Sequence, residues 1–310
     1  MTVIEIHEGL RRTIEQFGDE GRAWLARLPE AISRLESEWN LEVGPTFGNA
    51  SVSYTAPATR THTGERVVLK VPIPHEEAEH EADALRVWGG RGAVRLIDLD
   101  EGTGAMLLEA CRPGDRLSDA VAPDEVSTIG GSLLRELHRP TDDHAVPFRR
   151  LGDVMRRWAE LARQRVRTIG DPADVDLVDE GAELLKRLPD EAAAHVLLHG
   201  DYHHWNVLAS TRESWLVIDP KPMVGDPVYD CAQFLGNRYG TRGPDHFESE
   251  LARFASAAGF DERRVLLWCF ARETENCQWY VSVDDRAGAN GSVRYARYLR
   301  TLVERRGGIR

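Results

Sequence analysis

The chain has 310 residues, of which 42% are hydrophobic and 29% are charged, and its formal net charge at pH 7 is −12. This composition is that of an ordinary globular protein, and the length allows two lobes, each with its own core. The acidic balance argues against a nucleic-acid-binding protein, because phosphate backbones attract basic patches. Apolar runs are too short to span a membrane, and the first residues lack a signal-peptide pattern. We therefore expect a cytoplasmic protein without membrane spans.

Cysteine and lysine are both sparse. The four cysteines are far apart and fit no metal-binding spacing, so we expect reduced, partly buried thiols. Only three of the 39 basic residues are lysines, namely Lys70, Lys186 and Lys221. Because this chain otherwise uses arginine, a lysine inside an apolar strand pattern calls for a specific reason.

The first third of the chain alternates helical and β-like patterns. Residues 22–40 read as a helix that is interrupted near Pro29. The runs SVSYTAPA and ERVVLKVP flank one turn, and the runs VRLIDLD and AMLLEAC flank another, which indicates two hairpins. Between the hairpins, residues 75–88 place apolar residues at helical spacing before two glycines, which predicts a helix.

From about residue 115 onward the pattern is mainly helical. Two short apolar runs interrupt it, HVLLH and WLVID, and these predict strands separated by a turn. The sequence therefore predicts an α+β fold with two lobes, which is a bilobal layout. We divide it into an N-terminal helical extension (1–40), a small β-rich lobe (41–111) and a larger, mainly helical lobe (112–310). Small-molecule sites often lie in clefts between such lobes.

The stretch from residue 199 to residue 206, HGDYHHWN, is rich in histidine, and two chemistries compete for it. Zinc and two-metal hydrolases also gather histidine and aspartate, but the other histidines supply no obvious second ligand strand. A phosphotransfer site needs a carboxylate beside the acceptor hydroxyl, and an amide oxygen and a second carboxylate for Mg²⁺. It also needs a lysine for the nucleotide phosphates, oriented by a glutamate.

The chain carries these five parts in the required order. Asp201 and Asn206 are five positions apart, as in the H-R-D-x-x-x-x-N loop of protein kinases, and Asp219 follows thirteen positions later. Lys70 lies in the strand pattern VVLKV, and Glu81 lies in the helix predicted after it. Five parts in this order are far more specific than any single one, and they predict a phosphotransferase that uses Mg²⁺ and ATP.

The chain resembles the aminoglycoside phosphotransferase family, which shares the protein-kinase-like fold. The resemblance rests on H-G-D-x-x-x-x-N at 199–206, I-D-P at 218–220 and G-D-P-x-Y-D at 225–230. The paired histidines at 203 and 204 and the run D-P-K at 219–221 resemble the aminoglycoside/hydroxyurea resistance kinases. The resemblance covers about residues 40 to 300 and is most specific within 197–235. It implies a Mg·ATP-dependent O-phosphotransferase with a cationic small-molecule acceptor, such as the aminoglycoside streptomycin.

The resemblance also implies roles for the matching residues. Asp201 would orient the acceptor hydroxyl and take its proton, while Asn206 and Asp219 would hold Mg²⁺. Lys70 would contact the nucleotide phosphates. Its partner would be Glu81, although Glu77 lies one turn earlier on the same helix face.

Two further segments resemble parts of a nucleotide site. Residues 43–54 stand in the place of the glycine-rich loop, but they depart from G-x-G-x-x-G. Backbone amides of the short stretch through Gly48, Asn49 and Ser51 would contact phosphate there. Residues 106–114 resemble the interlobe hinge, where adenine would bond the backbone at Glu109 and Cys111.

The remaining polar residues of the motifs can have structural roles in place of roles in catalysis or acceptor binding. His199 is expected to bond within the loop, and Asp230 is expected to anchor the loop through backbone amides. His203 and His204 either pack the loop or contact the acceptor.

We expect the acceptor to contact Glu273, Glu275 and Trp279 in the helix predicted over residues 272–285. Glu275 and Trp279 share a face of this helix at i, i+4. The alternative is a solvated acidic face with a core tryptophan. Other functions that the sequence allows are a hydroxyurea kinase, a metabolite kinase for an amino sugar or amino alcohol, or a catalytically silent nucleotide-binding relative. A catalytically silent relative would not need to keep Asp201, Asn206, Asp219 and Lys70. The presence of all four residues argues against that alternative.

Overall fold

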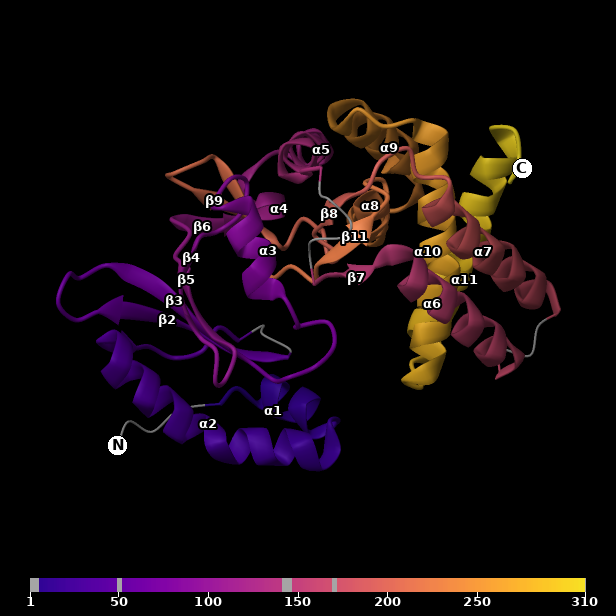
Figure 1. The fold of residues 1–310 in the computed structure, drawn as a ribbon. Coiled ribbons are helices and arrows are strands. Elements are labelled where there is room, and N and C mark those ends of the chain that lie inside the picture. The colour runs from indigo at the N-terminus through magenta and orange to yellow at the C-terminus, as the bar shows by residue number, and fades with distance from the viewer. Residues whose placement is uncertain (1–5, 49–51, 141–146, 169–171, 310) are drawn as a thin grey trace. The chain divides into compact units, whose positions relative to one another are not determined.

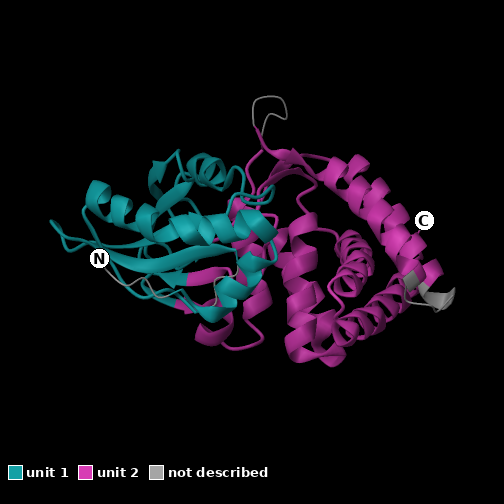
Figure 2. Cartoon of the chain, turned by 90° about the horizontal axis from the view of Figure 1, so that it is seen from below, with its two compact units in different colours: residues 1–114, 209–216 teal, residues 115–208, 217–310 magenta. Residues whose placement is uncertain are grey.

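The computed structural model describes residues 6–48, 52–140, 147–168 and 172–309. The chain forms two compact units (Figure 2). Unit 1 contains residues 1–114 and 209–216, and unit 2 contains residues 115–208 and 217–310. No helix among the described residues is both long and apolar enough to cross a membrane.

Unit 1 is built on a five-stranded antiparallel sheet with the order β1-β2-β3-β5-β4. Its strands are β1 (Leu41–Val43), β2 (Ser53–Arg60), β3 (Arg66–Pro72), β4 (Leu96–Asp100) and β5 (Ala105–Glu109). The β2–β3 and β4–β5 pairs are the two hairpins predicted from the sequence. Inward-facing residues alternate with partly exposed ones along β2, as expected for a sheet with one covered face.

The described part of unit 1 also contains the helices α1 (Glu8–Glu15), α2 (Gly18–Trp39) and α3 (Glu81–Trp88). Apolar residues of α1 and α2 form one core cluster with residues of β2 and β3, so these two helices cover one face of the sheet (Figure 1).

Two helices differ from the prediction. Helix α2 runs through Pro29 without interruption, because its buried stripe, which includes Leu28 and Ile32, stabilises the helix more than one lost N–H destabilises it. Helix α3 begins only at Glu81, because residues 76–80 form turns and His80 has a left-handed backbone with φ 67°.

Unit 2 is mainly helical. Its helices are α4 (Leu117–Ala120), α5 (Val126–Leu137), α6 (Leu151–Arg165), a 3₁₀ turn η1 (Val166–Thr168), α7 (Pro172–Asp190), α8 (Tyr229–Arg242), α9 (Pro244–Ala258), α10 (Glu262–Ser282) and α11 (Arg286–Arg305). Helix α10 packs against α6, α7, α8, α9 and α11. Residues 265–271 are all buried, as expected for a helix surrounded by other helices.

Two small sheets carry the short strands of the second half of the chain. Their orders are β10-β9-β6 and β7-β11-β8. The strands are β6 (Pro113–Arg116), β7 (Arg149–Arg150), β8 (Val196–Leu198), β9 (Val207–Ser210), β10 (Trp215–Val217) and β11 (Met223–Gly225). The sequence predicted β8 and β10. The other strands have two to four residues, which is too short for a periodic pattern to stand out.

The close approach of α7 and α10 gives a test of this packing. A Cβ atom at Gly181 of α7 would lie 1.8 Å from Thr274 Oγ1 of α10, whereas a Cβ at Gly240 of α8 would meet nothing within 4 Å. We expect Gly181→Ala to lower the free energy of unfolding by ~2 kcal/mol through overpacking. The matched Gly240→Ala should raise it by ~0.5 kcal/mol through helix propensity. Denaturant unfolding measures both, and an unchanged Gly181→Ala protein would contradict the packing.

Candidate functional site

The loop that follows β8 is fixed by one buried carboxylate. Asp230, in the first turn of α8, accepts hydrogen bonds from the backbone amides of His199 and Gly200, each at 2.9 Å. His138 Nε2 lies 3.0 Å from the same carboxylate. The predicted anchoring role of Asp230 is confirmed, and His138 joins it as a residue that the sequence did not indicate.

Gly200 is required by a close backbone crossing. Its φ is +79°, and a Cβ atom at this position would lie 1.9 Å from the carbonyl oxygen of Lys221. The amide of Lys221 donates to the carbonyl of His199 at 2.8 Å, which ties the two segments together. Any side chain at Gly200 would therefore push the loop away from residues 219–221.

His199 has the structural role predicted for it. Its Nδ1 accepts from the amide of Asp201 at 3.3 Å, and its Nε2 donates to the carbonyl of Ile218 at 3.0 Å. Burial lowers the pKa of His199, so the ring is neutral with one donor and one acceptor nitrogen. This tautomer fits both hydrogen bonds.

Asp201 is held by two donors, one on each carboxylate oxygen. Lys221 Nζ lies 2.7 Å from Oδ2, and Gln233 Nε2 donates to Oδ1 at 2.9 Å. His203 Nε2 lies 3.7 Å from Oδ1. Neither Lys221 nor Gln233 was assigned a role from the sequence. The sparseness of lysine and the D-P-K run were signals for Lys221, whereas Gln233 has no sequence signal.

Asn206 and Asp219 offer oxygen atoms next to this loop. The side-chain Nδ2 of Asn206 donates to the carbonyl of Asp201 at 3.0 Å, so the amide oxygen is the end that is left for another ligand. Its carbonyl accepts from the amide of Ile218, which brings the residue before Asp219 to the loop. Asp219 has φ +61°, a left-handed conformation that costs free energy outside glycine and is common at functional sites. Amide and carboxylate oxygens are the donors that Mg²⁺ prefers.

In unit 1 the structure pairs Lys70 of β3 with Glu81, the first residue of α3. Lys70 Nζ lies 2.6 Å from both carboxylate oxygens of Glu81. The two residues are 6% and 3% exposed. The choice that the sequence left open between Glu81 and Glu77 is thus decided in favour of Glu81 as the contact of Lys70.

Only some of the other nucleotide contacts predicted in unit 1 lie among the described residues. Gly48 lies in an exposed turn before β2, while Asn49 and Ser51 are outside the described residues. Glu109 ends β5, and its side chain binds Arg212 with contacts of 2.8 and 2.9 Å. Burial opposes ionisation of Glu109, but the hydrogen bonds from Arg212 prevail and lower its pKa.

The hinge segment continues to Cys111. Burial raises the pKa of the Cys111 thiol to about 12, so this thiol is protonated and unreactive. All four cysteines are free thiols, as the sequence predicted.

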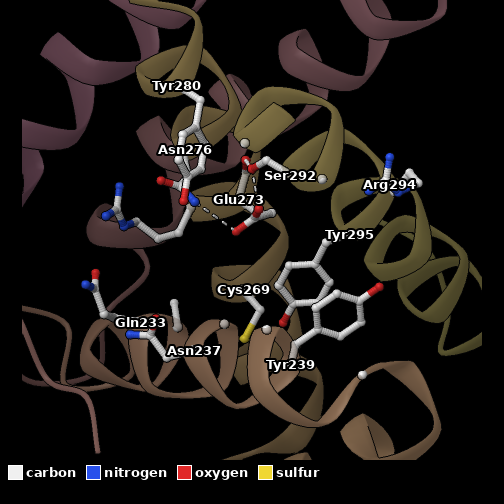
Figure 3. A pocket seen from close by; sticks show the side chains of 17 residues that line it. Gln233, Asn237, Tyr239, Cys269, Glu273, Asn276, Tyr280, Ser292, Arg294 and Tyr295 are labelled. Atoms are coloured by element: carbon white, nitrogen blue, oxygen red, sulfur yellow. Dashed lines mark hydrogen bonds between the residues drawn. The ribbon is translucent and has the colours of Figure 1, made fainter. Parts of the chain in front are cut away.

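A cavity of about 630 Å³ lies within unit 2, between α8, α10 and α11 (Figure 3). Gln233, the partner of Asp201, is part of its lining, so the cavity begins next to the Asp201 carboxylate. The stacked rings of Tyr239 and Tyr295, with centroids 3.7 Å apart, form an aromatic wall. The buried hydroxyl of Tyr295 has no hydrogen-bond partner among the described residues.

Glu273 supplies the carboxylate of this cavity. Figure 3 shows its side chain in the lining, bonded to Ser292 and Asn276. Burial raises the pKa of Glu273 to about 7, because a carboxylate loses hydration there and the two neutral donors compensate only in part.

The other two predicted acceptor contacts point elsewhere. Glu275 binds Arg272 at 2.7 Å, and Arg272 in turn stacks on Trp158 with its guanidinium carbon 4.5 Å from the ring centroid. Trp279 is 49% exposed and is absent from the cavity lining. Of the three residues, only Glu273 lines the cavity.

The paired histidines differ in their surroundings. His203 lies beside Asp201, and burial lowers its pKa. His204 is fully buried against Trp205 and Phe234, and burial lowers its pKa to about 4. Neither ring nitrogen of His204 has a hydrogen-bond partner among the described residues. The surroundings of His204 favour loop packing over acceptor contact.

Comparisons with known proteins identify the family of this chain. The family model of the aminoglycoside/hydroxyurea antibiotic resistance kinases matches residues 42–284. A streptomycin 6-kinase of Streptomyces glaucescens is 32% identical over 305 residues, covering 96% of this chain and 98% of the relative. A hydroxyurea phosphotransferase of Kitasatospora aureofaciens is 31% identical over 287 residues, covering 91% of this chain and 82% of the relative.

Among solved structures, a choline/ethanolamine kinase family protein from Mesorhizobium loti matches with a TM-score of 0.62 at 16% identity, covering 88% of this chain and 94% of that chain. This likeness shows the protein-kinase-like fold and confirms the predicted fold class. The chain belongs to the aminoglycoside/hydroxyurea antibiotic resistance kinase family. It is therefore a small-molecule phosphotransferase, and the metal-hydrolase and silent-relative alternatives no longer apply.

The buried position of His204 predicts how its replacement changes stability and turnover. A buried ring nitrogen without a partner costs ~1 kcal/mol or more, so His204→Leu should raise the free energy of unfolding by ~1 kcal/mol and keep turnover. Thermal unfolding and an activity assay measure this, with the exposed His62 as the matched site, where His62→Leu should change neither quantity. A destabilised or inactive His204→Leu protein would contradict the loop-packing role.

Proposed function

We propose that the protein transfers the γ-phosphoryl group of Mg·ATP to a hydroxyl of streptomycin, with Asp201 as the base. The observation that carries the proposal is the contact between Asp201 and Gln233, which puts the base beside the cavity that contains Glu273. The named relatives act on streptomycin or hydroxyurea, so both acceptors enter the comparison.

The size of the cavity favours streptomycin over hydroxyurea. A volume of about 630 Å³ is in the range of pockets for drug-sized ligands, whereas hydroxyurea is a urea with one added oxygen. Arg272 and Arg294 also line the cavity, and Arg272 is paired with Glu275 at 2.7 Å. Glu273 is then the carboxylate that binds a guanidinium group of the acceptor, while Tyr239 and Tyr295 pack against its rings.

The residues present fit Mg²⁺ and a nucleotide. The amide oxygen of Asn206 and the carboxylate of Asp219 would hold Mg²⁺, and Lys70, oriented by Glu81 in unit 1, would contact the phosphate oxygens. Bound Mg²⁺ would neutralise part of the phosphate charge. Gly48 and the backbone near Glu109 and Cys111 would complete the nucleotide contacts in the lobe assigned to residues 41–111.

The chain's own residues then act as follows. Gln233 and Lys221 hold the Asp201 carboxylate in one orientation, Asp201 orients the acceptor hydroxyl, and its oxygen accepts the hydroxyl proton as the phosphoryl group is transferred. Asp230 keeps the loop in place through two backbone amides. A requirement for ATP and the free thiols both fit a cytoplasmic protein.

The first test is acceptor-dependent ADP release with streptomycin, a second aminoglycoside and hydroxyurea. Streptomycin should give the highest kcat/KM. Asp201→Asn should lower kcat by ~10²- to 10⁴-fold because the base is lost. The exposed Asp245→Asn serves as the matched control and should leave kcat unchanged. Turnover with hydroxyurea alone would show that hydroxyurea, and not streptomycin, is the acceptor. Full activity of Asp201→Asn would contradict the role of Asp201 as the base.

The second test is the pH dependence of kcat/KM. Only ionised Glu273 attracts a cation, and its pKa is about 7, so kcat/KM for streptomycin should fall as the pH is lowered through this value. Glu273→Gln should remove this part of the pH profile and raise KM by about tenfold, as expected for one lost charged hydrogen bond. The control is the exposed Glu262→Gln on the same helix. An unchanged profile in Glu273→Gln would exclude this residue as the cation contact.

A further inference from the structure

Glycines inside two helices form part of the cavity wall in unit 2. Gly236 and Gly240 belong to α8, Gly288 and Gly291 belong to α11, and all four line the cavity. Glycine is less favourable inside a helix than alanine, because its backbone loses more conformational freedom on folding. A glycine within a helix therefore calls for a reason, and close packing against a neighbouring element is the usual one.

Close packing accounts for Gly288. A Cβ atom at this position would lie 2.3 Å from the ring of Tyr280 in α10. The same reason holds outside the cavity at Gly131 of α5, where a Cβ atom would lie 2.5 Å from the carbonyl oxygen of Phe254 in α9. At these two positions a methyl group would force neighbouring helices apart.

Close packing does not account for Gly236 and Gly291. The nearest atom to a Cβ at Gly236 would be Tyr295 Cε1 at 3.9 Å, and the nearest to a Cβ at Gly291 would be Arg294 Nη2 at 3.9 Å. Both distances are ordinary van der Waals contacts, so a methyl group fits at either position. Both glycines are half-buried and line the cavity. The fold therefore has room for side chains that are missing from the cavity wall.

A polar group in the same wall also points to a bound molecule. Tyr295 is 4% exposed, and its hydroxyl has no hydrogen-bond partner among the described residues. Nearly all buried polar groups of native proteins are hydrogen-bonded, so an unpaired one marks a site that a ligand or a water molecule completes. Tyr295 lines the cavity beside Tyr239 (Figure 3), and its ring is the group nearest to Gly236. The open space at Gly236 and the unpaired hydroxyl therefore belong to one wall.

We propose that Gly236 and Gly291 are specificity-determining residues, which keep the cavity wide enough for an acceptor with several linked rings. This inference rests on the proposed function of the cavity as the acceptor site. It names the substrate class as cationic sugars of two or more rings, and not single small molecules such as hydroxyurea. A side chain at either glycine would occupy the space of one part of such an acceptor, while the Asp201 carboxylate would be unchanged.

Stability and acceptor binding together separate this role from a structural one. Alanine at an open helical position stabilises the folded chain through helix propensity. A side chain in the cavity also removes room from the acceptor, so alanine at Gly236 should raise stability and weaken acceptor binding. A glycine that the packing requires would lower stability when replaced, as expected for Gly288 beside Tyr280.

The test is titration calorimetry of streptomycin and of Mg·ADP with Gly236→Ala, Gly236→Leu and Gly291→Leu. Each leucine variant should bind streptomycin at least ~10-fold more weakly, the loss that corresponds to the lower end of overpacking costs. Gly236→Ala should give a smaller loss and should raise the midpoint of thermal unfolding by ~1 °C. All three variants should bind Mg·ADP as the wild type does.

The matched control is Thr241→Leu, which adds a leucine at an exposed position of α8 outside the cavity lining. It should change neither affinity. Acceptor-dependent ADP release provides the second readout, in which the leucine variants should raise KM for streptomycin at least ~10-fold and Thr241→Leu should leave it unchanged. Thermal unfolding shows whether each variant is folded, and Gly236→Ala gives the result if a leucine variant is not.

Unchanged streptomycin affinity in Gly236→Leu and Gly291→Leu would overturn the inference and leave the proposed function intact. A lower unfolding midpoint in Gly236→Ala would also overturn it, because close packing would then account for the glycine. A wild type that binds no streptomycin would refute the proposed acceptor together with the inference. The affinity of the wild type therefore distinguishes the two failures.

Discussion

The buried carboxylate of Asp230 is the interaction on which the site depends. It receives the amides of His199 and Gly200 and contacts His138, so the loop after β8 has one orientation. A buried charge is costly unless it is fully paired. Loss of these donors would therefore destabilise the observed conformation of the loop. The same orientation brings Gly200 against Lys221 and turns Asp201 toward Gln233.

The charged side chains buried in unit 2 differ in whether another charged side chain is bonded to them. In unit 2, Arg272 is neutralised by Glu275, and a second buried network joins Arg238 and Arg242 to Glu250. Burial, by contrast, raises the pKa of Glu273, and the neutral donors Ser292 and Asn276 offset this effect only in part. In the function proposed above, a cationic acceptor would give the ionised Glu273 a charged partner inside the cavity.

The sequence predicted the parts of the site that short motifs encode. The spacing of Asp201 and Asn206 and the strand position of Lys70 follow from local chemistry, and so do the two hairpins of unit 1. The cavity could not be predicted, because Gln233, Tyr239 and Glu273 meet only through the packing of α8, α10 and α11. Helical spacing placed Glu275 and Glu273 on one helix but could not tell which one Arg272 would bind.

The most direct test of the account is a crystal structure with streptomycin and a non-hydrolysable ATP analogue. We expect the acceptor to lie in the cavity lined by Gln233 and Glu273, with one hydroxyl within hydrogen-bond distance of Asp201 and a guanidinium group in contact with Glu273. An acceptor bound outside this cavity, or inside it with no hydroxyl near Asp201, would contradict the account.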